Sequence, residues 1–455
     1  MKENRSATVK KLRPLQLAAI IFLTISGGPY GLESLLTYAG SHGTLVLLFI
    51  TPILWDIPTI FTVLELNSMM PVTGGYYQWV KRAMGLRFAW YEGWWTWLYT
   101  FVDLAIYPVL FVEYLSFFVP GVEAYKIPVC LVIIWGSAWL NIRGIVPVGK
   151  ASVFLGAAVL APFVILFVYF VTHHTGSFAL PSPSLSGVKF PMLGLGLYTV
   201  MWNFLGWDNV TTYAEEVAHP IRSYLKSVAI AFLLIFVVYF MAVMVALQSG
   251  IDYTVLSEEG FPALGTLVGG QWLGTLIACG GMASGIGLYS AVLLSVSRVP
   301  KVMSDDELLP AKLHALHPKF QTPYVSIISC STVVSLMVMW TFADLLIIDV
   351  ILYGAALFLE FVTLIIFRIK APDEHRPFKI PLNITGLCIM IAFPVAVYSI
   401  ALMGAFSESG STIWPVLFAL AILLTGEIIW RFIIWRKPHL KMAAVTVYKK
   451  LFRNE

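Results

Sequence analysis

The sequence predicts an all-α polytopic membrane protein with twelve transmembrane helices, and three observations support this fold class. First, 59% of the 455 residues are hydrophobic and only 12% are charged, which gives a mean hydropathy of +0.83. Soluble globular domains do not have this balance. Second, apolar runs of about 20 residues, the length that crosses a bilayer as a helix, recur along the chain. Third, Lys and Arg gather in alternate connections between these runs.

The first apolar run begins near Leu15, after a segment that carries five Lys and Arg. No small-residue cleavage site follows it, so we expect a retained helix and not a signal peptide. The runs at 85–119 and 263–299 are long enough to be strongly tilted or to extend beyond the bilayer. In order, the predicted spans are 14–38, 43–69, 85–119, 127–142, 150–172, 191–217, 222–248, 263–299, 324–341, 344–368, 383–406 and 412–435.

The distribution of positive charge predicts the orientation. With the N-terminus inside, 27 of the 29 Lys and Arg fall on the inner side, and only Lys126 and Lys189 fall outside. Cytoplasmic connections carry an excess of Lys and Arg, so both termini are expected in the cytoplasm, with the chain in the plasma (inner) membrane. We expect one transmembrane domain over 14–436, a cytoplasmic segment at 1–13 and a basic cytoplasmic tail at 437–455 that rests on the inner leaflet. The polar connection Ser304–Pro318 is predicted to hold a short surface helix.

A break is predicted in the middle of the first span, at Ile25–Glu33. Two adjacent glycines and a proline, Gly27, Gly28 and Pro29, remove side-chain packing and one backbone donor, so a continuous helix is not expected here. Irregular backbone at this depth is tolerated only inside protein or beside a cavity. Glu33 follows directly, and ionisable residues in spans are costly and usually functional. The alternative is that the glycines only permit close helix packing.

A second break is predicted in the sixth span, where Asn203, Gly206, Asp208 and Asn209 interrupt an apolar run. The first and sixth spans are five apart, which is the relation expected of two inverted five-helix repeats. Interrupted spans at corresponding positions of two halves are the best sequence indication of a midplane binding site, and they favour a secondary transporter. The exposed ends of the half-helices offer amides to anionic groups and carbonyls to cationic groups.

Acidic and aromatic residues inside the spans supply further site predictions. Asp103 lies in the third span with Tyr99 and Tyr107 at i−4 and i+4, on one helical face. That face is suited to an ammonium group, through charge and cation–π contact; a structural ion pair is the alternative. Trp202 is interpreted either as a gate over the site or as a packed core residue. Glu33 and Asp208, beside the two breaks, are the strongest acidic candidates.

The sequence predicts neither a metal site, nor a cofactor, nor an enzyme. Its four cysteines lie scattered in apolar runs, without the spacing of metal ligands or of a disulfide framework. No Walker loop, HExxH motif or nucleophile elbow stands on a suitable element, which excludes an ATP-driven pump or an intramembrane protease.

These residues resemble those of the amino acid–polyamine–organocation transporters, over nearly the whole chain. Ser26-Gly27-Gly28 stands where that superfamily has its helix 1 break, and Trp202–Asp208 is similar to its helix 6 pattern of an aromatic, then Phe, Gly and an acid. Within the superfamily, several stretches look like the polyamine uptake branch of plants and protozoa. They are residues 26–33, 71–76, 103–111, 141–144 and 376–381.

The resemblance implies a leucine-transporter-type fold, with spans 1–5 and 6–10 as inverted repeats and the last two peripheral. It also implies that amides at Ser26–Gly28 hold a substrate carboxylate, that carbonyls around Trp202–Leu205 take the amino group, and that Trp202 is the occluding gate. Pro29 lacks an N–H, and Glu33 adds negative charge where a carboxylate would lie. This departure favours an amine-rich substrate. The expected binding residues are Ser26, Gly27, Gly28, Tyr30, Glu33, Tyr99, Asp103, Tyr107, Trp202, Asn203, Phe204, Gly206 and Asp208.

Coupling is predicted by family analogy only. The lysine that some relatives carry in the fifth span is replaced here by apolar residues around Val159, and the eighth span offers only Ser284 and Ser290 toward a sodium site. Proton coupling through a carboxylate, or exchange, is therefore expected.

The predicted function is secondary active transport of a polyamine or cationic amino acid by alternating access. The alternative of the same class is a neutral or branched-chain amino acid permease in which Glu33 is structural. A different class is a membrane sensor that binds its ligand without moving it. The expected partners are a small amine or amino acid, H⁺ and the lipid bilayer, with no nucleic acid.

Overall fold

The computed structural model describes residues 11–173, 181–339, 342–406 and 414–440. This part of the chain is mostly helical, and its β pairing is limited to two isolated bridges, Leu12 with Val217 and Thr73 with Tyr213. The predicted all-α class is therefore confirmed. The predicted terminal segments 1–13 and 437–455 lie largely outside the described residues.

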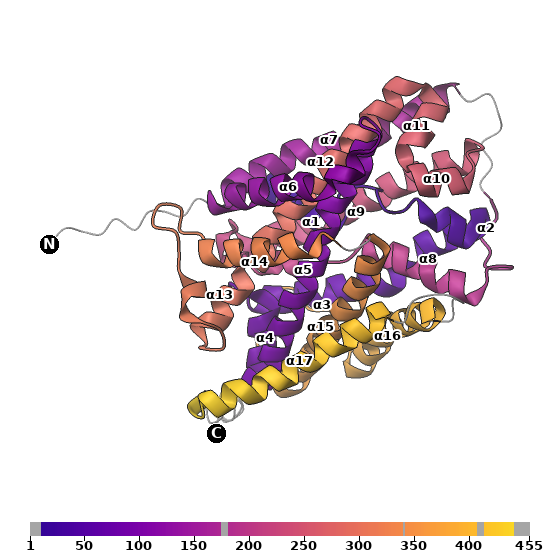
Figure 1. Ribbon diagram of the computed structural model, residues 1–455. Helices are drawn as coiled ribbons and strands as arrows, with labels where there is room; N and C mark the ends of the chain where they lie inside the picture. Colours follow the sequence, from indigo (N-terminus) through magenta and orange to yellow (C-terminus); the bar gives the residue numbers. More distant parts are fainter. Residues whose placement is uncertain (1–10, 174–180, 340–341, 407–413, 441–455) are drawn as a thin grey trace.

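Seventeen α-helices make up the described chain (Figure 1). The first half forms α1 (Pro14–Ile25), α2 (Ser34–Thr51), α3 (Ile57–Met69), α4 (Gly75–Met84), α5 (Leu86–Ser116), α6 (Lys126–Ile142) and α7 (Ile145–His173). The second half forms α8 (Phe190–Trp202), α9 (Pro220–Gln248), α10 (Tyr253–Glu259), α11 (Phe261–Gly269), α12 (Gln271–Val296), α13 (Arg298–Asp305), α14 (Tyr324–Met337), α15 (Phe342–Lys370), α16 (Ile384–Phe406) and α17 (Trp414–Arg436).

Nine helical segments of the described residues are long and apolar enough to cross a membrane. Three shorter apolar helices, α1, α8 and α14, accompany them. Two of these, α1 and α8, are the first halves of the spans predicted to be broken, so their shortness follows from the breaks. The polytopic class is thus established, and the count of twelve crossings stays a prediction.

Several predicted boundaries change because glycine ends a helix. The prediction of one long run at 263–299 is wrong: Gly270, at φ +85°, separates α11 from α12, and α13 follows as a further helix. A left-handed φ is easily adopted only by glycine, and it cannot continue an α-helix. Gly40, at φ +62°, kinks α2 between the predicted first and second spans. A short π-helical segment, Pro52–Asp56, then joins α2 to α3.

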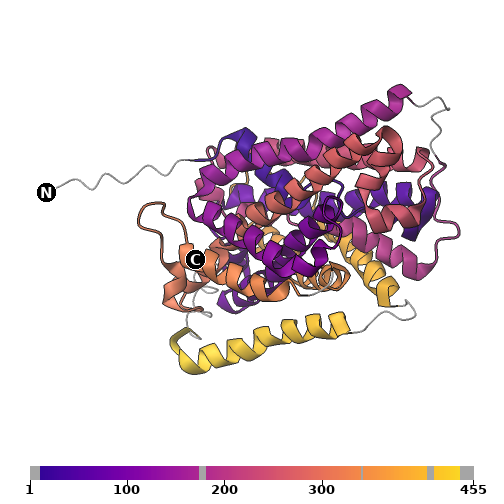
Figure 2. The same cartoon turned by 45° about the horizontal axis from the view of Figure 1, so that its top comes forward.

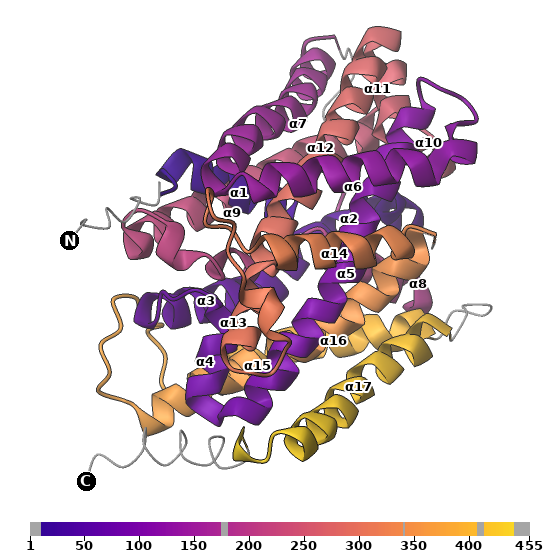
Figure 3. The same cartoon turned by 60° about the vertical axis from the view of Figure 1, so that its left-hand side comes forward.

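The centre of the bundle is built from α5, α12 and α15, and α7 packs on α12 at its outer side; α1 packs against α7, α9 and α12. Figures 1 and 3 place α4 and α13 at one end of the molecule and α10 and α11 at the opposite end. The yellow helix α17 runs along the outside (Figure 2), where it contacts α15 and α5. Large apolar side chains are exposed on α6, α7, α16 and α17 (Trp139, Phe154, Met403 and Leu424 among them), as expected of surfaces that face lipid.

Candidate functional site

The first span is interrupted at the predicted place. Helix α1 ends at Ile25 and α2 begins at Ser34. Between them, Gly27 and Gly28 have φ values of +59° and +98°. Gly27 is also closely surrounded, because a Cβ added there would lie 2.5 Å from Leu288 Cδ1 of α12. Gly27 thus serves both the turn of the backbone and its close approach to α12, whereas Gly28 serves the turn and approaches Val159 of α7.

The sixth span is interrupted as well, and more extensively than predicted. Helix α8 ends at Trp202, and Gly206 has a φ of +98°. The prediction of a helix that resumes after the break and reaches residue 217 is wrong: only two short 3₁₀ turns, Asn209–Thr211 and Ala214–Glu216, precede α9. The hydroxyls of Thr211 and Thr212 bond to the carbonyls of Asp208 and Asn209, at 2.6 and 2.9 Å, and such local bonds compete with helix formation.

One tyrosine joins the two breaks. The Tyr239 hydroxyl of α9 lies 2.7 Å from Ser26 Oγ and donates to the Asn203 carbonyl at 2.7 Å. Because both contacts are buried, the phenol fixes the distance between the unwound segments. Movement of either segment therefore requires this bridge to break or to move with it.

The amides of the first break are already paired within the chain. The N–H groups of Ser26 and Gly27 both donate to the Phe22 carbonyl, at 3.0 and 3.1 Å. The Gly28 amide donates to Ser26 Oγ at 3.0 Å. A substrate carboxylate would have to displace these bonds in order to bind here.

A closed chamber lies between the two breaks and the helices α5, α12 and α15. The volume inside it that the centre of a water molecule can occupy is ≈ 10 Å³. This is enough for about one water molecule. Its lining consists of Thr24, Ile25, Ser26, Tyr99, Asp103, Tyr107, Trp202, Asn203, Leu205, Gly206, Asn209, Leu288, Asp349 and Tyr353. The chamber must expand to admit a substrate.

The walls of the chamber are acidic. Asp103 of α5 and Asp349 of α15 both line it, and their charges act on each other. The Tyr107 hydroxyl donates to Asp103 Oδ1, whereas Asp349 Oδ1 is buried without a hydrogen-bond partner. Among the described residues that line it, none is Lys, Arg or His. Two buried carboxyl groups without a basic partner must either hold protons or meet a cation.

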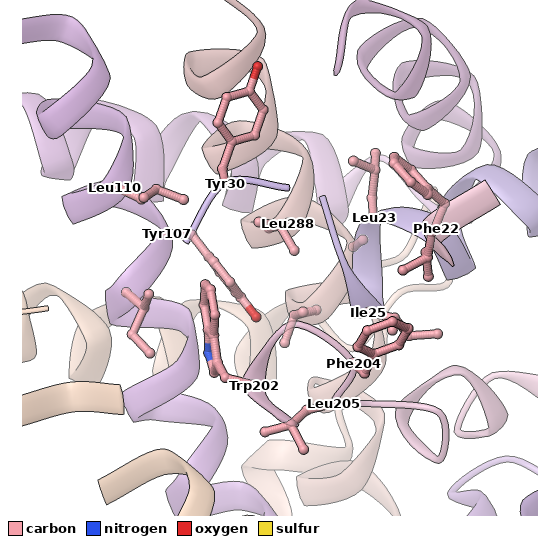
Figure 4. Packing of buried hydrophobic residues seen from close by; sticks show 14 of the residues in the cluster. Phe22, Leu23, Ile25, Tyr30, Tyr107, Leu110, Trp202, Phe204, Leu205 and Leu288 are labelled. Carbon is pink, nitrogen blue, oxygen red and sulfur yellow. The ribbon is translucent and has the colours of Figure 1, made fainter. Parts of the chain in front are cut away.

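Seven of the thirteen predicted binding residues line this chamber. They are Ser26, Tyr99, Asp103, Tyr107, Trp202, Asn203 and Gly206. Figure 4 shows Tyr107 and Trp202 side by side, while Tyr30 points away from them. The Tyr30 hydroxyl donates to the Ile277 carbonyl at 2.8 Å, and its ring packs on Tyr114 and Phe163.

The other predicted residues stand around the chamber without lining it. Gly27 and Gly28 shape the backbone of the first break, and Phe204 packs against Phe232 and Tyr239. Asp208 lies behind Tyr353, whose hydroxyl donates to Asp208 Oδ1 at 2.8 Å.

Glu33 faces a second, larger cavity toward the end that carries α10 and α11. This vestibule has a volume of ≈ 690 Å³, measured as the space open to the centres of water molecules. Glu33 accepts hydrogen bonds from the Gly31 amide at 2.6 Å and from the Tyr114 hydroxyl. The vestibule is lined by five carboxylates, Glu33, Glu113, Glu123, Glu258 and Glu259, and by no basic residue.

Trp202 stands between the chamber and the vestibule. It lines the chamber, and a Cβ added to Gly31, which lines the vestibule, would lie 2.6 Å from Trp202 Cζ3. The indole is therefore packed directly against the first break. This placement is the one that a gate between the two spaces requires.

The opposite end of the site is closed by polar contacts. Leu12 pairs with the backbone at Glu216, whose carboxylate forms an ion pair with buried Arg298 at 3.0 Å. The Thr73 hydroxyl donates to Glu215 at 2.6 Å. The segment before α1, the end of the sixth span and α13 are thus held together at this end.

Seven chamber residues are absent from the predicted binding set, and the two whose side chains matter most for a charged ligand are Asp349 and Tyr353 of α15. Their signal was nevertheless present, because Asp349 is an acid inside an apolar run with an aromatic at i+4. This is the pattern that singled out Asp103 and Tyr107. Asn209 and Leu205 also line the chamber; Asn209 was predicted only as part of the second break and Leu205 only through its backbone carbonyl. Thr24, Ile25 and Leu288 complete the lining, and no feature of these residue types distinguishes them before the breaks are placed.

A polytopic helical protein with a closed polar chamber between two interrupted spans has the architecture of a secondary transporter. The chain belongs to the amino acid permease family, whose family model matches residues 12–426. This family is part of the amino acid–polyamine–organocation superfamily, and its members are transporters, not enzymes.

The similarity to individual relatives extends over most of the chain. The polyamine transporter RMV1 of Arabidopsis thaliana is 31% identical over 86% of this chain and 80% of its own length. A probable polyamine transporter of the same plant is 33% identical over 86% of this chain and 82% of its own length. The polyamine transporter PUT1 of Oryza sativa subsp. japonica is 29% identical over 87% and 74%.

Proposed function

We propose that this permease moves a polyamine or a cationic amino acid across the plasma membrane by alternating access, with both chain termini in the cytoplasm. The observation that carries the proposal is the chamber wall, where Asp103 and Asp349 face one small space without a basic residue. A single amine 4 Å from a carboxylate gains about 4 kcal/mol at an effective dielectric constant near 20. A neutral amino acid is a zwitterion, so it would add no net positive charge to a wall that carries two carboxyl groups.

Two further observations support an amine without a carboxylate. The amides at Ser26, Gly27 and Gly28 are paired within the chain, so an anionic group finds no ready donor there. The relatives at about 30% identity include proteins named as polyamine transporters. A polyamine carries ammonium groups and no carboxylate. It therefore suits both the acidic chamber wall and the first break, whose amides are already paired.

The proposed binding residues take distinct roles. Asp103 and Asp349 pair with the first ammonium group, while Tyr99, Tyr107 and Trp202 surround its methylene chain. Ser26, Gly27, Gly28, Asn203, Phe204 and Gly206 shape the backbone of the breaks. Trp202 gates the passage to the vestibule, where Glu33 attracts the incoming cation; Tyr30 braces the first break. Asp208 contributes negative charge from behind Tyr353. Proton coupling or exchange accompanies the movement.

The test is uptake into liposomes that contain the purified protein, with labelled putrescine, spermidine, arginine and leucine. Saturable uptake of the cationic substrates, with leucine inert, is the expected result. Uptake of leucine alone overturns the cationic assignment in favour of the neutral permease. Ligand binding without any flux would identify a sensor.

Glu33→Gln is expected to slow uptake of spermidine at low concentration, since the vestibule then attracts the cation less. Unchanged uptake would show that Glu33 is not part of the pathway.

A further inference from the structure

Three buried carboxyl groups stand beside the chamber, on segments that pack against α4. They belong to Glu92 of α5, Asp208 of the second break and Glu360 of α15, and they are 0%, 2% and 0% exposed. Helices α4, α5 and α15 pack against one another. The three charges act on one another in every pairing. We call Glu92, Asp208 and Glu360 the acidic triad.

The hydrogen-bonding capacity of the triad is largely unused. Both carboxyl oxygens of Glu360 are buried without a partner, as is Glu92 Oε2. Glu92 Oε1 accepts a bond from Thr96 at 3.3 Å. The hydroxyl of Tyr76 interacts electrostatically with all three carboxyl groups, and it is also buried without a hydrogen-bond partner. Burial of an ionised carboxylate without a partner is very costly, so each such group must carry a proton or meet a cation.

Among the residues that the structure describes, none around the triad supplies a cation for this purpose. The titratable groups that interact with the triad are tyrosines: Tyr76 from α4, Tyr99 from α5 and Tyr353 from α15. Arg368, the arginine of α15 that follows Glu360, is instead paired with Glu65 at 2.6 Å. Among the described residues, no three carboxyl, imidazole or thiol groups converge closely enough to hold a metal ion. A proton is therefore the cation that fits.

The triad is connected to the substrate chamber. Asp208 Oδ1 accepts the Tyr353 hydroxyl at 2.8 Å, and the Gly206 amide donates to the oxygen of Tyr353 at 3.4 Å. Tyr353 and Gly206 both line the chamber. A rearrangement of the second break around a bound substrate thus changes the position of Asp208 relative to Glu92 and Glu360.

We propose that Glu360 and Glu92 bind the proton that moves during the transport cycle, with Asp208 and Tyr353 linking them to the chamber. In the closed state they hold protons as neutral carboxylic acids. When the α4 end opens, water reaches the site; a carboxylic acid then transfers its proton to water, leaving a carboxylate and a hydronium ion. The carboxylate later takes a proton from a hydronium ion on the other side, which leaves a carboxylic acid and a water molecule. The inference rests on the proposed transport function, but it does not depend on which amine is carried.

The experiment compares two assays in the same liposomes. One measures accumulation of labelled putrescine driven by an imposed pH gradient, together with proton movement reported by a trapped pH-sensitive dye. The other measures counterflow, in which labelled putrescine exchanges for unlabelled putrescine without net proton transfer. Glu360→Gln and Glu92→Gln, which resemble the protonated acid, are expected to lose the gradient-driven accumulation and the proton movement while retaining counterflow. Glu307→Gln, at an exposed carboxylate of the same end, is the matched control.

Each outcome decides the matter. Proton movement that persists in both triad variants overturns the proposal, and so does wild-type accumulation driven by sodium without proton movement. A change in putrescine affinity with intact proton coupling means that the triad holds a substrate amine, which also overturns it. If one variant loses its thermal unfolding transition, the other is measured. Absence of both uptake and counterflow in the wild-type protein contradicts the transport function itself and is thereby distinguished from failure of the triad.

Discussion

At the residue scale, two acid–tyrosine pairs line the chamber. They have the same spacing in the sequence, but their tyrosine hydroxyls donate hydrogen bonds to different carboxyl groups. Asp103 and Tyr107 bond to each other within α5. Asp349 and Tyr353 have the same i, i+4 spacing on α15, but the Tyr353 hydroxyl turns to Asp208 instead. Asp349 Oδ1 is left buried and without a partner. An ammonium ion is therefore expected to stabilise Asp349 more than Asp103, because it would supply the missing hydrogen-bond partner.

Asp349→Asn is expected to raise the KM for putrescine by about 10- to 100-fold, from the 1.5–3 kcal/mol of a hydrogen bond to a charged group. Asp103→Asn should have a smaller effect, because Tyr107 already satisfies one of its oxygens. Liposome uptake over a range of putrescine concentrations measures both values.

Asp252→Asn is the control for this substitution. Asp252 caps α10 by accepting the Thr254 amide at 2.8 Å, away from the chamber. An unchanged KM in Asp349→Asn would contradict the assignment of Asp349 as the ammonium partner.

At the scale of the element, the breaks are formed by backbone conformation and held by neighbours. Gly27 adopts a left-handed φ and lies against Leu288 and Ser284 of α12, so its missing side chain serves both needs. Gly206 also has a positive φ, but a Cβ added there would lie no closer than 3.4 Å to any neighbour, which is an ordinary contact distance. The first break is thus fixed by packing on α12, and the second is held mainly by the Tyr239 bridge and local threonine bonds.

Gly27→Ala is expected to lower the free energy of unfolding by about 1–3 kcal/mol through overpacking, and to reduce transport because α1 is pushed from α12. The matched control is Gly250→Ala: Gly250 has a comparable φ of +72°, but nothing lies within 4 Å of an added Cβ. The difference in thermal unfolding between the two variants isolates the packing contribution. Equal stability and equal uptake would show that the contact with Leu288 is unimportant.

At the scale of the whole molecule, the chamber is closed at both ends, by different means. Trp202 closes it toward the vestibule with an aromatic side chain at a hydrophobic contact. The contacts of Leu12, Glu216 and Arg298 close the other end through backbone and charge. A site that is closed from both ends and must open to one at a time is what alternating access requires.

The orientation of the molecule is open to a direct test. In a variant without the four native cysteines, a cysteine at exposed Thr254 of α10 is expected to react with a membrane-impermeant thiol reagent added outside intact cells. A cysteine at exposed Lys319, between α13 and α14, is expected to react only after the membrane is permeabilised. The charge distribution predicts this pattern, since cytoplasmic connections are rich in Lys and Arg; the reverse pattern would contradict it.

The sequence alone determined the membrane class and the position of both interruptions. These properties depend on contiguous residues: a bilayer selects apolar runs of sufficient length, and Gly27, Gly28 and Gly206 alter the backbone where they stand. The chemistry of the chamber was predicted in part, through Ser26, Asp103 and Trp202. The extent of unwinding after Asp208 was not, because the Thr211 and Thr212 side-chain bonds that replace the helix have no clear sequence signal.

Only the tertiary structure decided which acids share a space. Glu33 and Asp208 both stand beside a break, yet Glu33 faces the vestibule and Asp208 lies behind Tyr353. Asp349, some 250 residues beyond Asp103 in the sequence, completes the chamber wall. Each helix is rotated by its packing against helices that are distant in the sequence, and this rotation determines where a side chain points. Hydropathy and local spacing predict that an acid lies within a span. Only the packing of α5 against α15 brings Asp103 and Asp349 to the same chamber.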